Sequence, residues 1–210
     1  GIGVAVLNTW IVPPPTGPQG QPVGHLVRFY GNVDNTKLTY PAVTPVGAPA
    51  QLHAGQVLEM GIMNEAFEVQ SDKEFAIATF MQGGAAVDPL APAGTRKGDP
   101  SQTQAVAVEQ YRQKYVFIAP NDFEVSYVDV ILPLDADAVL DGSALPIAPV
   151  PIGTSGHGVS RVPLSGSSVH VILADKPFGI QVAGYARNTS YHYPGGLALQ
   201  AIAPPLPPVK

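Results

Sequence analysis

The sequence predicts an all-β protein with β-sandwich architecture, built from two similar antiparallel β units, and three observations lead to this prediction. Proline (23 residues) and glycine (22 residues) are spread between short apolar runs of the 210-residue chain, as in proteins where many turns join short strands. Charged residues make up only 13% of the chain, whereas long helices normally expose Glu and Lys on one face. The signature Asp-Lys-x-Phe-x-Ile occurs twice, at residues 72–77 and 175–180.

The alternation of β-branched or aromatic residues with polar ones predicts the individual strands. In the first half of the chain they are residues 3–9, 25–31, 37–40, 57–62, 67–70 and 75–81, and residues 51–55 are expected to be a strand end plus a turn. In the second half they are residues 114–118, 126–132, 138–140, 160–164, 168–173, 178–186 and 197–202. Residues 10–23 and 190–196 are expected to be loops. Near residues 106–113 we expect one short helix or, as the alternative, an extended approach to the next strand.

These elements predict two β units that pack as one structural entity. We place the first unit at residues 1–118, with a long loop over residues 82–113. The second unit covers residues 119–210 and ends in a proline-rich tail. A loop as long as the one in the first unit is usually functional or mobile.

The repeated signature predicts a hairpin in each unit, with Asp-Lys at the turn. Aspartate favours turn starts because its side chain bonds to the backbone two residues further on. In the strand after the turn, Phe75 and Ile77 share one face, as do Phe178 and Ile180. The Asp and Lys of the signature are therefore expected to be structural.

The composition excludes several classes of function. The net charge is −5 and no basic cluster occurs, so a nucleic-acid partner is not expected. No apolar run reaches the length of a transmembrane helix. The chain has no cysteine, which rules out disulfides, thiolate nucleophiles and Cys-ligated zinc. The five histidines lack the paired spacing of metal ligands, so neither a metal nor a cofactor is expected.

Carboxylates leave two alternatives open. A carbohydrate-active enzyme would need two of them converging on one bond, and the candidates Glu59, Glu65, Glu68, Asp99 and Glu109 have no spacing that forces this. Calcium binding would use the aspartates of residues 135–142. Their spacing differs from that of an EF-hand and is typical of a strand between two turns, which we favour.

Two segments have the composition of a recognition surface, because they gather Tyr, His, Arg and Glu after the two copies of the signature. The candidate ligand-binding residues are Glu109, Tyr111, Arg112, Tyr191, His192 and Tyr193. In the alternative interpretation, the tyrosines pack over a sheet end with their hydroxyls bonded. No catalytic residue is predicted.

Four stretches carry a resemblance to a known family: residues 98–101 (GDPS), 109–117 (EQYRQKYVF), 175–180 (DKPFGI) and 190–196 (SYHYPGG). Together they resemble the IgGFc-binding protein N-terminal domain family, over residues 24–199. The resemblance implies a non-enzymatic binding or adhesion module that is secreted or exposed at the cell surface. It supplies no catalytic residues or metal ligands. The lack of cysteine favours a bacterial-type copy.

Three hypotheses about function follow. The first is an extracellular or cell-surface module that recognises a protein or glycan through its loops, without catalysis. The second is a structural spacer or assembly subunit of a larger surface protein, joined to neighbouring domains. The third and least favoured is the carbohydrate-active enzyme.

Overall fold

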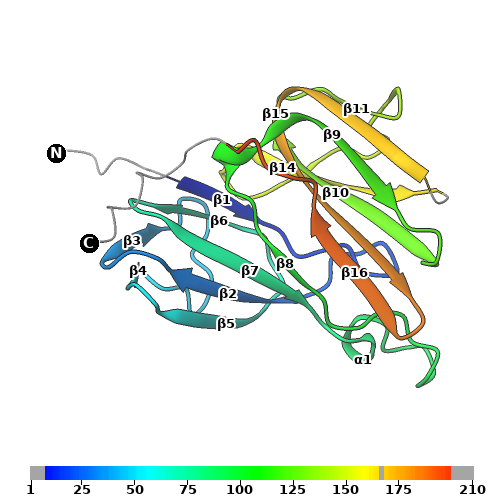
Figure 1. Ribbon diagram of the computed structural model, residues 1–210, viewed down its shortest axis with the longest axis horizontal. Coiled ribbons are helices and arrows are strands. Elements are labelled where there is room, and N and C mark those ends of the chain that lie inside the picture. Colours follow the sequence, from blue (N-terminus) through cyan, green and yellow to red (C-terminus); the bar gives the residue numbers. More distant parts are fainter. Residues whose placement is uncertain (1–7, 166–167, 200–210) are drawn as a thin grey trace, which may run out of the picture.

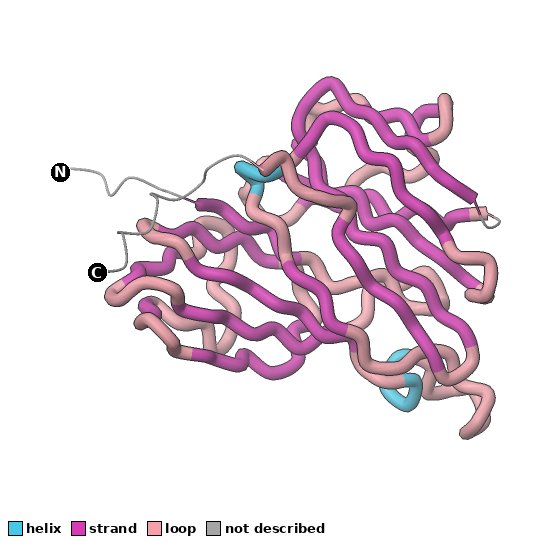
Figure 2. Tube along the Cα trace, viewed as in Figure 1, coloured by secondary structure: helices cyan, strands magenta, loops and turns pink. Residues whose placement is uncertain are grey.

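The computed structural model describes residues 8–165 and 168–199. Strands make up most of this part of the chain, which confirms the all-β prediction (Figure 1). The helical segments of this part of the chain are a short α-helix, Gly84–Val87, and a 3-10 turn, Val108–Gln110 (Figure 2). Neither segment has the length or the apolarity to cross a lipid bilayer.

The first unit consists of two four-stranded sheets, β1-β6-β3-β4 and β5-β2-β7-β8. Its core lies between them and contains Trp10, Phe29, Phe67 and Phe75, with the rings of Phe29 and Phe75 stacked at 5.7 Å. The elements are β1 (Asn8–Val12), β2 (His25–Gly31), β3 (Thr36–Thr39), β4 (Gln51–Leu52), β5 (Val57–Met63), β6 (Phe67–Ser71), β7 (Phe75–Met81), α1 (Gly84–Val87) and β8 (Gln102–Gln104).

The second unit repeats this layered arrangement around one long strand, β15. The first part of β15 pairs with β9 and β11, and its last part pairs with β10 and β16. The core lies between the two layers and includes Tyr115, Val130, Ile172, Phe178 and Ile180. The elements are η1 (Val108–Gln110), β9 (Arg112–Ala119), β10 (Val125–Pro133), β11 (Ala138–Leu140), β12 (Ser143–Ala144), β13 (Val150–Pro151), β14 (His157–Leu164), β15 (Ser168–Ala186) and β16 (Thr189–Pro194).

The strand pairings of the two units correspond. In the first unit β6 lies between β1 and β3, and β7 lies between β2 and β8. In the second unit the two parts of β15 lie between β9 and β11 and between β10 and β16. The division of the chain after residue 118 stays a prediction, and the pairing of β9 with β15 favours a boundary before Arg112.

The predicted hairpins at the Asp-Lys signature are wrong. Strands β6 and β7 lie in different sheets, so the chain crosses from one layer to the other at residues 72–74. In the second unit β15 runs on through the signature, with a register shift between Leu173 and Phe178. Alternating Phe and Ile side chains indicate a strand with one buried face, but they do not say which strand is its neighbour.

The signature nevertheless has the expected structural role. The carboxylate of Asp72 accepts the N–H of Lys37 at 2.7 Å, and that of Asp175 accepts the N–H of Asp137 at 2.8 Å. The backbone N–H of each signature aspartate donates in return to the carbonyl of the same partner residue. Each crossover is thereby fastened to the start of the neighbouring strand, β3 or β11. The lysine of the second signature, Lys176, pairs with Asp135 at 2.5 Å.

Three other expectations need correction. The segment 10–23 is not all loop, because Trp10, Ile11 and Val12 belong to β1 and are buried. The segment 190–196 forms the strand β16 as far as Pro194. The short helix expected near residues 106–113 is present only as a 3-10 turn, Val108–Gln110. The first and last predicted strands, 3–9 and 197–202, lie partly outside the described residues.

Candidate functional site

Tyr191 and Tyr193 of β16 pack against the core of the second unit. The hydroxyl of Tyr193 donates to the carbonyl of Ile118 at 2.5 Å and accepts the N–H of the same residue at 3.2 Å. The hydroxyl of Tyr191 donates to Ser126 at 2.9 Å, and its ring meets that of Phe123 edge-on at 4.6 Å. Burial raises the pKa of both tyrosines. Both hydroxyls are thus bonded within the fold, as the packing interpretation expects.

His192 points to the opposite face of β16, where the two units meet. Its Nε2 lies 3.1 Å from the side-chain oxygen of Gln181, and burial lowers the pKa of the imidazole to about 4. His25 of the first unit is buried at the same joint. Burial lowers its pKa to about 3, and the charges of His192 and Arg161 add to the effect. Both imidazoles are therefore neutral at physiological pH.

The other three candidates surround the turn η1. Tyr111 is buried, and its ring packs so closely on β15 that a Cβ at Gly179 would lie 2.5 Å from it. The carboxylate of Glu109 accepts the N–H of Thr9 at 3.0 Å. Arg112 is exposed, and its guanidinium lies 6.0 Å from the ring centroid of Tyr115. Arg112 is the most accessible of the six predicted residues, whereas Tyr111 and His192 are buried.

The two predicted recognition segments come together in space, because β8 and β16 lie next to each other (Figure 1). The long loop before β8 is fastened to the turn between β15 and β16. Gly98 donates its N–H to the carbonyl of Ala186 at 3.1 Å, and Asn188 donates to Arg96 at 2.9 Å. This anchoring places the loop along the boundary between the two units, which we call the seam.

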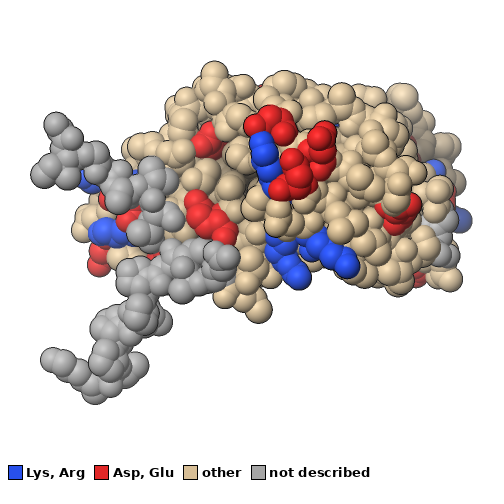
Figure 3. Space-filling view, turned by 90° about the horizontal axis from the view of Figure 1, so that it is seen from above, with Lys and Arg blue, Asp and Glu red and all other residues tan. Residues whose placement is uncertain are grey.

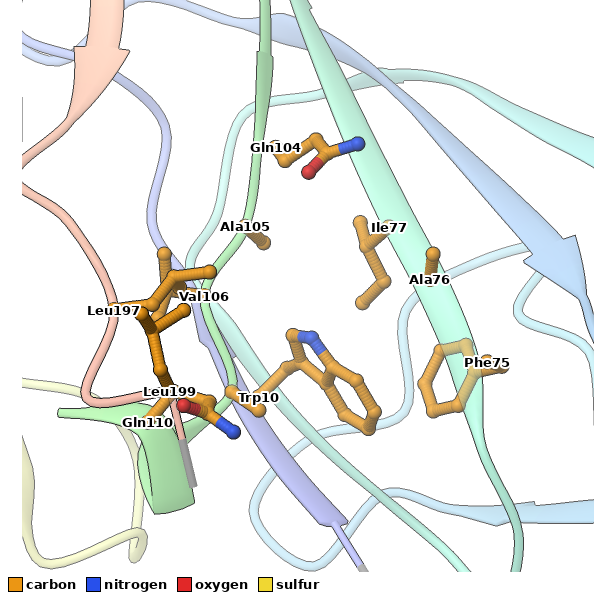
Figure 4. A pocket seen from close by; sticks show the side chains of 11 residues that line it. Trp10, Phe75, Ala76, Ile77, Gln104, Ala105, Val106, Gln110, Leu197 and Leu199 are labelled. Carbon is orange, nitrogen blue, oxygen red and sulfur yellow. The ribbon is translucent and has the colours of Figure 1, made fainter. Parts of the chain in front are cut away.

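A shallow apolar groove of about 360 Å³ lies on this seam (Figure 4). The indole of Trp10 and the ring of Phe75, with centroids 4.1 Å apart, lie on one side of it, and Leu197 and Leu199 lie on the other. The N–H of Ala198 donates to the carbonyl of Gln110 at 2.9 Å and so holds the second wall against η1. The groove is lined by Trp10, Phe75, Ala76, Ile77, Gln104, Ala105, Val106, Ala107, Gln110, Leu197 and Leu199.

Sequence reasoning missed the groove, because it placed Trp10 in a loop and gave Leu197 and Leu199 to a strand. The one available signal was Trp10 itself, the only tryptophan of the chain. Large aromatic side chains of this kind dominate both cores and interfaces. Nothing local in the sequence shows that residues 10, 75 and 197 meet.

Several of the carboxylates considered for catalysis or calcium binding bind other groups of the fold. Glu59 pairs with Arg28 at 2.6 Å, and Asp141 pairs with His170 at 2.7 Å. Among residues 8–165 and 168–199, no group of three or more His, Asp or Glu side chains is arranged to hold a metal ion. Figure 3 shows the charged side chains of one face in small groups, separated by wide uncharged stretches.

Comparison with known proteins identifies one family. The family model described as IgGFc binding protein matches residues 8–184, which include most of the first unit and most of the second. No curated protein and no solved structure shows a significant match to the chain.

Proposed function

Because the chain belongs to the IgGFc binding protein family, we propose that it is an extracellular, non-enzymatic module that binds a protein partner, as in adhesion at a surface. The match spans both units, so the double sandwich is the part of the chain to test for binding. The Fc part of immunoglobulin G is the first ligand to test, because the family description names it.

The observation that carries the choice of site is the apolar groove on the seam. Its volume of about 360 Å³ suits a few side chains of a partner segment. Its apolar lining favours a protein over a glycan as the ligand. Leu199 is 84% exposed at one wall, so a partner that covers it removes a large apolar side chain from water.

Polar groups flank the groove on one side. Arg112 and Glu109 lie on either side of Gln110, which lines the groove itself. Arginine is enriched among the residues that contribute most to interfaces. We assign Arg112 and Glu109 to the polar rim of the site, and Tyr191 and Tyr193 to positioning β16 beside it.

Biolayer interferometry with the immobilised chain tests this function, first with Fc and then with ligands from a protein and glycan array. For a protein ligand found in this way, Leu199→Ser should weaken binding about tenfold. Leu90→Ser is the matched control, because Leu90 is 97% exposed outside the groove. If Leu199→Ser and Leu90→Ser bound the ligand equally well, the groove would not be the binding site. If no protein ligand were found, the proposed binding function would be wrong.

A second candidate function, an assembly subunit, is favoured by a different observation. The outer face of the sheet formed by β9, β15 and β11 exposes a row of aliphatic side chains. That face lies in the second unit and takes no part in the groove.

A further inference from the structure

The joint between the two units is a contact between outer sheet faces. Ile11 of β1 packs with Ile131 of β10 and Val159 of β14, and these side chains are 1%, 3% and 3% exposed. The neighbours of Ile11 along β1, Trp10 and Val12, point into the core of the first unit. Side chains alternate along a strand, so Ile11 faces outward. The outer face of β1 therefore packs on the outer face of β10 and β14.

The matching face of the second unit is open. The two signature aspartates, Asp72 and Asp175, set an offset of 103 residues (175 − 72). Ile11 pairs with Glu68, and Val116 pairs with Val171, which is 103 residues after Glu68. Val116 thus occupies the position of Ile11. It is 59% exposed, whereas Ile11 is buried.

Further aliphatic side chains surround Val116 on this open face. Val169 and Ile118 form a cross-strand pair and are 62% and 54% exposed. Leu173 continues the row and is also exposed. In the first unit the residue that matches Leu173 at this offset is Gln70, which is polar. Adjacent exposed aliphatic side chains on a sheet face mark an interaction surface.

The face that would receive this surface is open as well, on the first unit. In the second unit Ile131 lies between Gly179 of β15 and Val159 of β14. In the first unit Tyr30 pairs with Ala76 of β7, 103 residues before Gly179, so Tyr30 occupies the position of Ile131. Tyr30 also pairs with Val57, which is 57% exposed. The correspondence extends to an ion pair beside each of these pairs. Asp129 with Arg161 is buried in the joint, and Arg28 with Glu59 lies at the surface.

A hollow on this face of the first unit has room for protruding side chains. It measures about 420 Å³, and Leu26, Ile62 and Phe80 are among the residues that line it. Arg28 also lines the hollow, and its guanidinium lies over the ring of Phe80 at 4.7 Å. One end of the molecule therefore presents the aliphatic row and the other a hollowed, partly apolar face.

We propose that copies of this chain associate head to tail, the outer face of β9 and β15 in one copy packing on the outer face of β2 and β5 in the next. The contact repeats between chains the joint that the two units make within a chain. It joins two different surfaces, so it extends into a row or a ring of copies and does not form a closed symmetric dimer. It uses neither wall of the groove and stands apart from the proposed ligand binding.

Sedimentation velocity of the whole chain over a range of concentrations tests the proposal. The wild type should form dimers and longer rows as the concentration rises. Val116→Asp and Val57→Asp should each weaken association about tenfold or more, because each places a charge at the centre of one face. Val46→Asp is the control, since Val46 is 92% exposed in a loop, and it should associate like the wild type.

Mixing the two variants separates a head-to-tail contact from a symmetric one. A Val116→Asp copy keeps an intact β2–β5 face, and a Val57→Asp copy keeps an intact β9–β15 face. An equimolar mixture should therefore form dimers that do not grow further. Val116→Thr, which keeps the branched shape of the side chain, should associate more strongly than Val116→Asp. This difference would show that the charge at position 116 weakens association, and that a folding defect is not the cause.

Three results would overturn the proposal: a wild type that stays monomeric at all concentrations, a Val57→Asp variant that associates normally, or a mixture that stays monomeric. Leu199→Ser should leave association unchanged, and Val116→Asp should leave ligand binding by the monomer unchanged. The two variants therefore distinguish a failure of the proposed assembly from a failure of the proposed ligand site in the groove.

Discussion

The close approach of Tyr111 to Gly179 yields a quantitative prediction about the joint between the units. A methyl group added at Gly179 would lie 2.5 Å from the Tyr111 ring, whereas ordinary contacts begin at 3.4 Å. The ring would have to move by about 0.9 Å (3.4 − 2.5). It is buried among Ile11, Ile131 and Val159, so it has little room to do so.

Gly179→Ala should therefore lower the free energy of unfolding by about 1–3 kcal/mol, the usual range for overpacking a core. For a chain of this size the melting temperature should fall by roughly 2–12 °C. Urea denaturation and calorimetry measure both quantities. Gly83→Ala is the control, because a Cβ at Gly83 meets nothing closer than 3.6 Å.

A double-mutant cycle tests the reason as well as the size of the effect. In a Tyr111→Ala background the ring is gone, so Gly179→Ala should change the stability by only a few tenths of a kcal/mol. If the full loss of stability persisted without the ring, the clash would not be its cause. A loss of the same size in Gly83→Ala would likewise refute the reasoning.

Three further predictions concern the joint, the signature and β16. The pKa values of His25 (about 3) and His192 (about 4) lie below the ordinary 6.5. The stability that these neutral side chains contribute is therefore present above about pH 6.5 and is lost as the pH falls towards 4. The melting temperature of the wild type should fall over this window, and that of His192→Gln should fall less. The raised pKa of buried Asp129 acts in the opposite direction, so the difference between wild type and variant is the quantity to measure, and equal curves would contradict the prediction. Asp175→Ala should lower the free energy of unfolding, measured in urea, by about 1 kcal/mol, because the N–H of Asp137 loses its acceptor. Asp175→Asn, which keeps an acceptor oxygen, should lower it less. Equal losses in the two variants would show that this hydrogen bond is not the cause. Tyr193→Phe should speed hydrogen exchange at the β9 amide that its hydroxyl accepts, whereas an unchanged rate would show that this bond does not protect the edge.

The fold class could be predicted from the sequence because burial of one face leaves a period of two along each strand. Strands β2, β7 and β11 begin and end at the residues that the pattern predicts. The pattern failed where the neighbours of a strand mattered. Whether the chain turns back at Asp72 or crosses to another sheet depends on pairing with β1 and β3, which are distant in sequence.

The candidate site shows the same limit for side chains. Residue type alone selected Tyr191, His192 and Tyr193. These residues lie on β16, which contacts β8, a strand distant in the sequence. Which face each side chain occupies was decided by the fold, since alternation along β16 sends the tyrosines to one side and His192 into the joint. The groove required contacts between three parts of the chain that no local pattern encodes.

The sequence by itself therefore determined most of the strands, the all-β class and the two copies of the signature, because these depend on local periodicity and turn chemistry. Only the tertiary structure decided which faces are covered. Ile11 and Val116 show this most directly, since both are aliphatic residues at matching strand positions, yet one is buried in the joint and the other faces solvent. The physical reason is that burial depends on what packs against a face: within the chain the second unit covers the outer face of β1, whereas the matching outer face of β9 is left exposed.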